Sequence, residues 1–70
     1  MAYFELISAD ESGFTYYYYP ENRRDKPGII GIRNGERFIE KLSEDDQGGM
    51  YARQCFRHLH GQPKGMAAWF

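Results

Sequence analysis

The chain has only one cysteine, no long apolar run and almost no net charge, and each of these absences argues against particular classes of protein. Cys55 alone cannot form an intrachain disulfide, which argues against a secreted disulfide scaffold and fits a reducing cytosol. No apolar segment approaches the roughly 20 residues of a membrane-spanning helix. Residues 1–5 lack the basic and apolar regions of a signal peptide. We therefore expect a cytoplasmic protein that makes no contact with a membrane.

Nine basic and ten acidic residues give a net charge of −1, which provides no overall field to attract nucleic acid or an anionic membrane. The sequence also contains no phosphate-binding loop, dinucleotide fingerprint, nucleophile elbow or paired metal motif. These absences predict that the protein is not an enzyme and holds no cofactor and no metal. Residues 1–70 are expected to form one small domain with a thin core, and domains of this size often depend on a partner subunit.

Aromatic residues are the abundant feature of the sequence. Six tyrosines, five phenylalanines and one tryptophan make up 17% of the chain, and residues 16–19 are four consecutive tyrosines. Aromatic side chains favour strands and bury large areas, so a small core can be built from few of them.

The pattern of apolar residues and turn residues predicts four strands and one helix. The strands are expected at residues 2–8, 14–19, 29–33 and 36–42, the helix at 49–60, and a charged loop at 20–28. Residues 65–70 are expected to form a short final strand or a tail packed on the sheet. Because turn-linked neighbours usually pair, we predict an α+β fold: a four-stranded antiparallel meander of two hairpins, with the helix packed on one face.

Asn34-Gly35 is the preferred two-residue type I′ turn, and it fixes the register of the second hairpin. Arg33 should face Glu36 as a pair of opposite charges, and Phe38 should lie over Gly31. One face of this hairpin then carries Ile30, Ile32 and Ile39.

In the first hairpin, the loop length decides which side chains share a face. A loop of three or five residues places Phe4, Leu6, Tyr16 and Tyr18 on one face and Tyr3, Ile7, Tyr17 and Tyr19 on the other. A loop of two or four residues mixes these two sets.

The helix is expected to present an apolar stripe formed by Tyr51, Ala52, Cys55, Phe56 and Leu59. Ser43 resembles a helix N-cap, with Asp46 at the capping-box position. Gly48 and Gly49 weaken that start, so either a short turn precedes the helix or the helix tolerates both glycines. We favour a start near Gly49 and an end at His60, since Gly61 and Pro63 follow.

The tyrosine run must place rings on both faces of the sheet, because a strand has a period of two and one helix covers only one face. The second face is then either partly covered by Trp69-Phe70 or by a loop, or it is an exposed aromatic patch that binds a partner or a second subunit. The candidate partner-binding residues are Tyr3, Tyr17, Tyr19, Phe38 and Trp69.

The charged loop carries Arg23, Arg24 and Lys26 beside the tyrosines, an arrangement that can contact phosphates while bases stack on aromatic rings. Glu21 and Asp25 largely offset this charge, and the net charge of the chain makes nucleic-acid binding the less favoured interpretation.

Cys55, His58 and His60 are residue types that bind zinc, but a structural zinc site needs four ligands in a closed arrangement. The two histidines point in nearly opposite directions on a helix, so distant carboxylates would have to complete a site. Cys55 is better explained as a small core residue, and residues 44–46 as the acidic first turn of a helix.

Three short segments are distinctive: Tyr-Tyr-Tyr-Pro-Glu at 17–21, Pro-Gly-Ile-Ile at 27–30, and Ser-Glu-Asp-Asp at 43–46 ahead of a helix that begins with Tyr51-Ala52. With these segments the chain resembles small proteins of Gram-positive bacteria or their phages. No activity is attached to that group, so the resemblance implies a bacterial or phage source and supplies no functional residue.

These observations favour a non-enzymatic protein-interaction module that binds a protein partner or forms a homodimer. The alternative is a single-stranded nucleic-acid-binding domain that uses the loop of Arg23, Arg24 and Lys26 together with exposed tyrosines.

Overall fold

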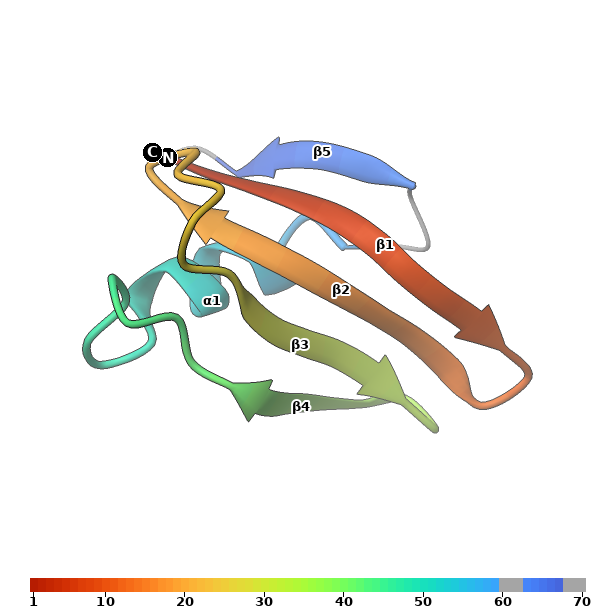
Figure 1. The fold of residues 1–70 in the computed structure, drawn as a ribbon. Helices are drawn as coiled ribbons and strands as arrows, with labels where there is room; N and C mark the ends of the chain where they lie inside the picture. The colour runs from red at the N-terminus through yellow and green to blue at the C-terminus, as the bar shows by residue number, and fades with distance from the viewer. Residues whose placement is uncertain (60–62, 68–70) are drawn as a thin grey trace.

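The computed structural model describes residues 1–59 and 63–67, which form one antiparallel sheet with a helix on one side (Figure 1). The elements are β1 (Ala2–Asp10), β2 (Gly13–Pro20), β3 (Gly28–Arg33), β4 (Glu36–Lys41), α1 (Met50–Phe56) and β5 (Lys64–Ala67). The strand order is β4-β3-β2-β1-β5. The predicted α+β meander is therefore confirmed, and the expected C-terminal strand lies beside β1. Residues 60–62 and 68–70 lie outside the described part of the chain.

The first hairpin has a two-residue turn. A turn of this length was expected to mix the two sets of side chains, whereas a loop of three or five residues was expected to keep them on separate faces. Asp10 pairs with Gly13, so residues 11–12 form the turn. The Asp10 carboxylate accepts hydrogen bonds from the Ser12 hydroxyl (2.6 Å), the Ser12 N–H (2.8 Å) and the Gly13 N–H (3.1 Å). These hydrogen bonds stabilise the turn and lower the pKa of Asp10.

A bulge in β1 reconciles this short turn with the predicted faces. The register shifts between Leu6 and Ser8, so β1 accommodates one extra residue at Ile7. Beyond the bulge, Phe4 pairs with Tyr18, as a longer loop would have placed it. The two predicted sets of side chains are therefore kept apart by the strand itself and not by the turn.

The second hairpin has the predicted register. Arg33 pairs with Glu36 across the turn, and Gly31 pairs with Phe38. Asn34 adopts φ 53° and Gly35 φ 80°, as a type I′ turn requires. A Cβ atom on residue 31 would lie 2.5 Å from the Phe38 ring, so only glycine lets the ring lie this close to the strand.

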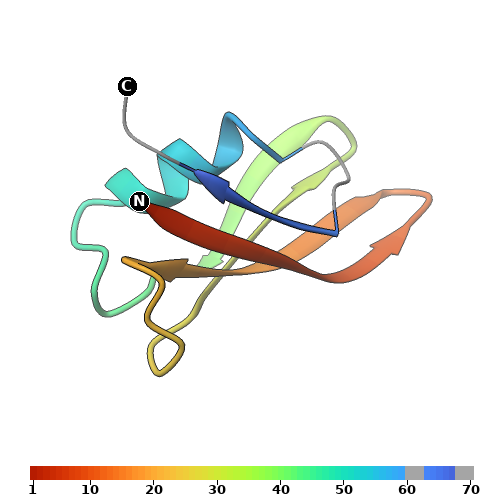
Figure 2. The ribbon, with the colours of Figure 1, turned by 90° about the horizontal axis from the view of Figure 1, so that it is seen from above.

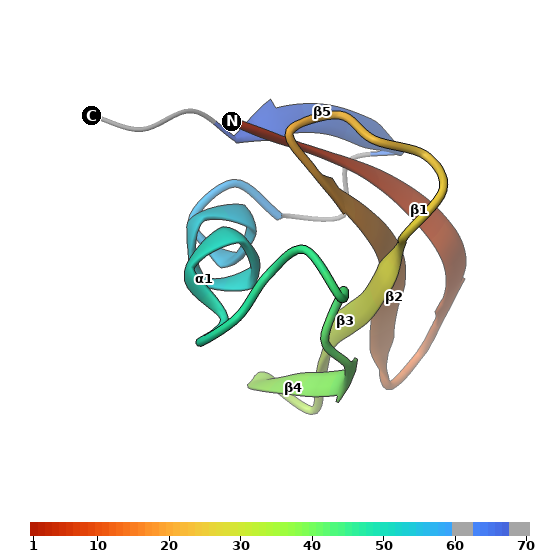
Figure 3. The ribbon, with the colours of Figure 1, turned by 60° about the vertical axis from the view of Figure 1, so that its left-hand side comes forward.

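The core lies between the sheet and α1, which contacts β1, β2, β3 and β5 (Figure 3). The buried residues that form it are Ala2, Phe4, Tyr16, Tyr18, Ile30, Ala52, Cys55, Phe56 and Leu59. The residues of the predicted apolar stripe all face the core, with Tyr51 packed against its margin, but Leu59 lies beyond the end of the helix and not on it.

The helix is shorter than the predicted 49–60. It begins at Met50, and no acidic residue lies in its first turn. It ends at Phe56 because the N–H groups of Arg57 and His58 bond to carbonyl oxygens three residues earlier, which tightens the chain out of the α-helical repeat.

Asp46, and not Ser43, caps the helix. The Asp46 side chain is 1% exposed and accepts hydrogen bonds from the Tyr51 N–H (2.9 Å), the Ala52 N–H (3.0 Å) and the Tyr18 hydroxyl (2.7 Å). Ser43 instead begins a separate turn, where its carbonyl oxygen accepts the Asp46 N–H. Of the two predicted alternatives, the short turn before the helix is correct.

The glycines allow Asp46 to reach the helix that follows it. Gly48 and Gly49 have φ values of 86° and 75°, which L-residues with side chains rarely adopt. This left-handed segment turns the chain back, so that a carboxylate four residues before Met50 accepts the free N–H groups of the first helical turn.

Strand β4 forms one edge of the sheet and is mostly exposed. Four of its six side chains are charged, in the sequence Glu-Arg-Phe-Ile-Glu-Lys. Charged side chains along an exposed edge discourage pairing with another strand.

We predict that Asp46→Ala lowers the free energy of unfolding by about 2–4 kcal/mol, because it removes the helix cap and leaves the buried Tyr18 hydroxyl without its acceptor. Urea unfolding followed by circular dichroism measures the change. Glu44→Ala is the matched control, since Glu44 is an exposed acid in the same segment, and it should change stability by less than about 0.5 kcal/mol. Equal effects of the two substitutions would contradict the prediction.

Candidate functional site

The face of the sheet opposite α1, here called the outer face, carries the strand tyrosines that are absent from the core cluster, namely Tyr3, Tyr17 and Tyr19. Tyr3 and Tyr19 are cross-strand neighbours, with ring centroids 5.9 Å apart and an interplanar angle of 25°. Tyr17 lies two residues along β2, with its ring centroid 6.3 Å from that of Tyr19. The structure therefore brings together three of the residues that the sequence suggested for partner binding.

The loop between β2 and β3 lies on the side of the sheet away from α1 (Figure 2). Its residue Arg24 places the guanidinium carbon 4.5 Å from the centroid of the Tyr3 ring and 4.8 Å from that of Tyr19. Nη1 of Arg24 is 3.8 Å from Oε1 of Glu5, which neighbours Tyr3 on the same face of β1. Tyr19 is consequently only 7% exposed. The loop thus provides part of the cover that the second face requires.

The rest of the outer face is more open. Tyr17 is 38% exposed and pairs with Glu5 on one side and with the half-buried Ile29 on the other. Phe38 also lies on this face, over Gly31, with the Arg33 guanidinium carbon 4.8 Å from its ring centroid. The last candidate, Trp69, lies outside the described residues.

Each basic residue suggested for nucleic-acid binding lies close to a carboxylate. Arg23 is 4.0 Å from Asp45, and Lys26 is 3.8 Å from Asp45 and 3.9 Å from Glu44. Arg24 faces Glu5. These exposed pairs contribute little to stability, at about 0–1 kcal/mol each, but they reduce the positive potential that a phosphate backbone would meet. The geometry therefore weakens the nucleic-acid interpretation.

Burial raises the pKa of the Tyr19 hydroxyl, and the nearby Glu5 carboxylate raises it further. The Tyr51 hydroxyl donates a hydrogen bond to Glu21, which raises the pKa of Tyr51. Both phenols are therefore neutral hydrogen-bond donors at physiological pH. Neither is poised to act as a base or a nucleophile.

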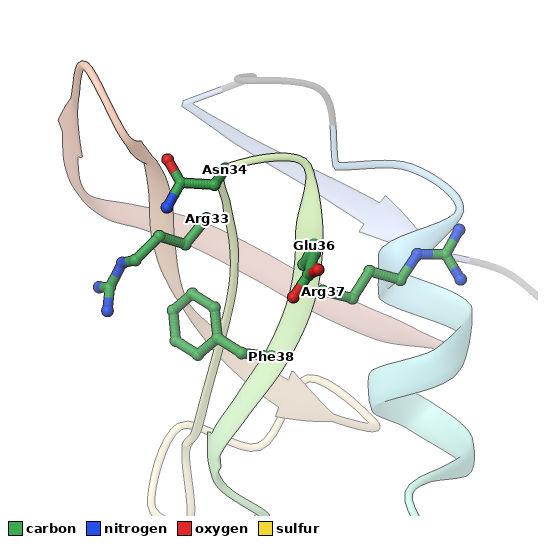
Figure 4. Close-up of a pocket in the computed structure, with 5 residues that line it drawn as sticks. All are labelled: Arg33, Asn34, Glu36, Arg37 and Phe38. Carbon is green, nitrogen blue, oxygen red and sulfur yellow. The ribbon is translucent and has the colours of Figure 1, made fainter.

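A hollow of about 420 Å³ lies at the tip of the second hairpin, lined by Arg33, Asn34, Glu36, Arg37 and Phe38 (Figure 4). Arg33 and Phe38 lie to one side of the hairpin, whereas Arg37 extends the other way toward α1. There the Arg37 guanidinium carbon is 5.5 Å from the centroid of the Phe56 ring. Because the charged groups diverge, this hollow does not assemble a catalytic constellation.

The Cys55 thiol is fully buried, and burial together with the nearby Asp46 charge raises its pKa to about 12. It is a core residue and not an activated nucleophile. No group of three His, Cys, Asp or Glu side chains within residues 1–59 and 63–67 is placed to hold a metal ion. His60 lies outside these ranges. No helix in the described part of the chain is long and apolar enough to cross a membrane.

Two contributions to the outer face were missed from the sequence. Glu5 was not considered, although the period of two places it on the same face as Tyr3. The sequence suggested Arg24 only as a phosphate contact in the less favoured nucleic-acid interpretation, yet its guanidinium carbon lies over two of the tyrosines. An arginine close to aromatic strand residues was the available signal for this contact.

Comparisons with models of known protein families, with curated proteins and with solved structures give no match. The fold and the geometry of the outer face are therefore the grounds for a functional proposal.

We predict that the protein loses stability as pH rises above about 9, partly through Cys55. The unfolded thiol ionises near 9.0, whereas the folded thiol keeps its proton to about 12. The folded state then binds more protons in this interval, so its stability falls by up to about 1.4 kcal/mol per pH unit. Urea unfolding between about pH 8 and about pH 10 should show a shallower decline for Cys55→Ala than for the wild type. Parallel declines would contradict the assignment to Cys55.

Proposed function

We propose that this chain is a non-enzymatic protein-interaction module that binds through the outer face of its sheet, with a second copy of itself as the first partner to test. The observation that carries the proposal is the position of Tyr17. It stands on the middle strand of the sheet and is 38% exposed, on the face that α1 does not cover. Tyrosine is a favoured anchor residue in interfaces, because it combines a large apolar ring with a polar tip.

The surroundings of Tyr17 support this role. Ile29 and Phe38 extend the apolar surface across β3 and β4, and the Arg24 loop borders it beyond Tyr19. An apolar centre with a charged rim is the usual anatomy of a protein interface. The thin core of a 70-residue chain adds a reason to bury more surface by association.

The cellular setting is part of the same proposal. A single thiol, buried in the core, suits a reducing compartment, so we place the module in the cytoplasm. The resemblance to small proteins of Gram-positive bacteria and their phages supports a bacterial source.

We predict that sedimentation velocity between about 5 and about 100 μM detects a dimer, and that Tyr17→Thr raises its dissociation constant at least tenfold, or roughly 1.4 kcal/mol, because an interface anchor is lost. Threonine keeps a strand-favouring side chain, so the fold is retained. Met50→Ser is the matched control, because Met50 is 55% exposed at the start of α1 and should leave the dimer unchanged.

A wild-type monomer throughout this range would refute self-association. Fluorescence anisotropy with a single-stranded oligonucleotide tests the competing class. Binding that weakens steeply with salt and is lost in Arg23→Ala would favour the nucleic-acid alternative. We expect no such binding, because the loop cations face carboxylates.

A further inference from the structure

The cluster of Tyr3, Tyr19 and Glu5 has the composition of a binding site for an organic cation, and Arg24 of the same chain fills it. We infer that an arginine side chain of the protein partner binds this cluster by displacing Arg24. The inference rests on the proposed function, and it names the chemistry by which the partner is recognised.

The residues that form this site belong to two inner strands of the sheet. Tyr3 and Tyr19 are directly paired residues of β1 and β2, and each of these strands has a hydrogen-bonded neighbour on both sides. Their aromatic faces attract a guanidinium group, and Glu5 adds a carboxylate beside it. The sheet therefore fixes the backbone positions of all three residues, and the contact between the Tyr3 and Tyr19 rings does not depend on the arginine that they bind.

Arg24, which occupies the site, is held less firmly than the residues that surround it. The Arg24 side chain is 61% exposed, and all six residues from 21 to 26 are exposed. The loop backbone is itself fixed, because the N–H groups of Glu21 and Asn22 donate hydrogen bonds to the carbonyl oxygens of Met1 and Tyr19, so only the Arg24 side chain has to move. A partner arginine therefore replaces an exposed side chain, which can move into solvent without disturbing the backbone of the loop or the core.

The geometry favours arginine over other cations. Arg24 shows that one planar guanidinium can lie over both rings and approach Glu5 at the same time. A lysine ammonium is a compact, strongly hydrated charge and cannot stack in this way. Lys64 of β5 stands opposite Glu5 in the register, so a segment with several adjacent cations would meet its positive charge. The site thus fits a partner segment that carries a lone arginine.

The test removes the Arg24 side chain from the site and measures whether a free arginine derivative binds there instead. Arg24→Ala is titrated with N-acetylarginine methylamide while the NMR signals of Tyr3 and Tyr19 are followed. We expect saturating shifts of both residues and a dissociation constant at least about tenfold lower than in the wild type, where Arg24 competes at a high effective concentration. The citrulline derivative has nearly the same shape without the charge and should cause no saturating shift, and the lysine derivative should bind more weakly than arginine.

Arg23→Ala is the matched control in the same loop. Arg23 is similarly exposed and pairs with Asp45, so this variant should bind arginine as weakly as the wild type. Equal binding by Arg24→Ala and the wild type, shifts that fail to saturate, or equal binding of arginine and citrulline would overturn the inference. Arg24→Gln, which retains a long side chain on the loop, should also bind arginine more tightly than the wild type.

This experiment is independent of the sedimentation assay. Arginine binding by Arg24→Ala, together with a monomeric wild type, would support the cation site and refute self-association through Tyr17. A Tyr17-dependent dimer without arginine binding would support the interaction surface and overturn the cation site.

Discussion

The hydrogen bond from the Tyr18 hydroxyl to the buried Asp46 carboxylate is the contact on which the rest of the structure depends. It joins the middle strand of the sheet to the segment that precedes α1, and the same carboxylate holds the first N–H groups of the helix. A buried carboxylate is tolerated only where donors surround it, so strand, turn and helix have to come together at this point. That requirement decides which face of the sheet α1 covers, and therefore which tyrosines are left for the outer face.

The parts of the fold that local chemistry determines were predictable. Asn34-Gly35 defines a turn and hence a register, and the period of a strand separates Tyr16 and Tyr18 from Tyr17 and Tyr19. The bulge at Ile7 was not predictable in the same way. It arises because the strand pairing before Ile7 and the pairing after it differ by one residue, and no local sequence signal marks that shift. The helix cap was misplaced for a related reason: Asp46 reaches the helix through two left-handed glycines, a path that the capping-box spacing does not describe.

In the candidate site, too, the residues on regular strands were predictable and the loop residue was not. Tyr3, Tyr17 and Tyr19 could be grouped because each belongs to a regular strand. The role of Arg24 depends on how an irregular loop folds back over the sheet, and composition does not indicate left-handed conformations at Glu21 and Asn22. The carboxylates that neutralise the loop also come from distant parts of the chain. A basic loop beside aromatic residues therefore suggested phosphates, whereas in the folded chain its cations already have partners.

The charged edge strand β4 limits the architecture of any assembly. Strands that pair edge to edge leave a new edge at each end, so such contacts propagate into fibres unless symmetry closes them. Two copies that meet through their outer faces bury the same patch on both sides and leave no equivalent patch free. For the proposed interaction, the contrast between a charged edge strand and an aromatic face therefore concerns stoichiometry as well as affinity: it favours a complex of finite size over open-ended polymerisation.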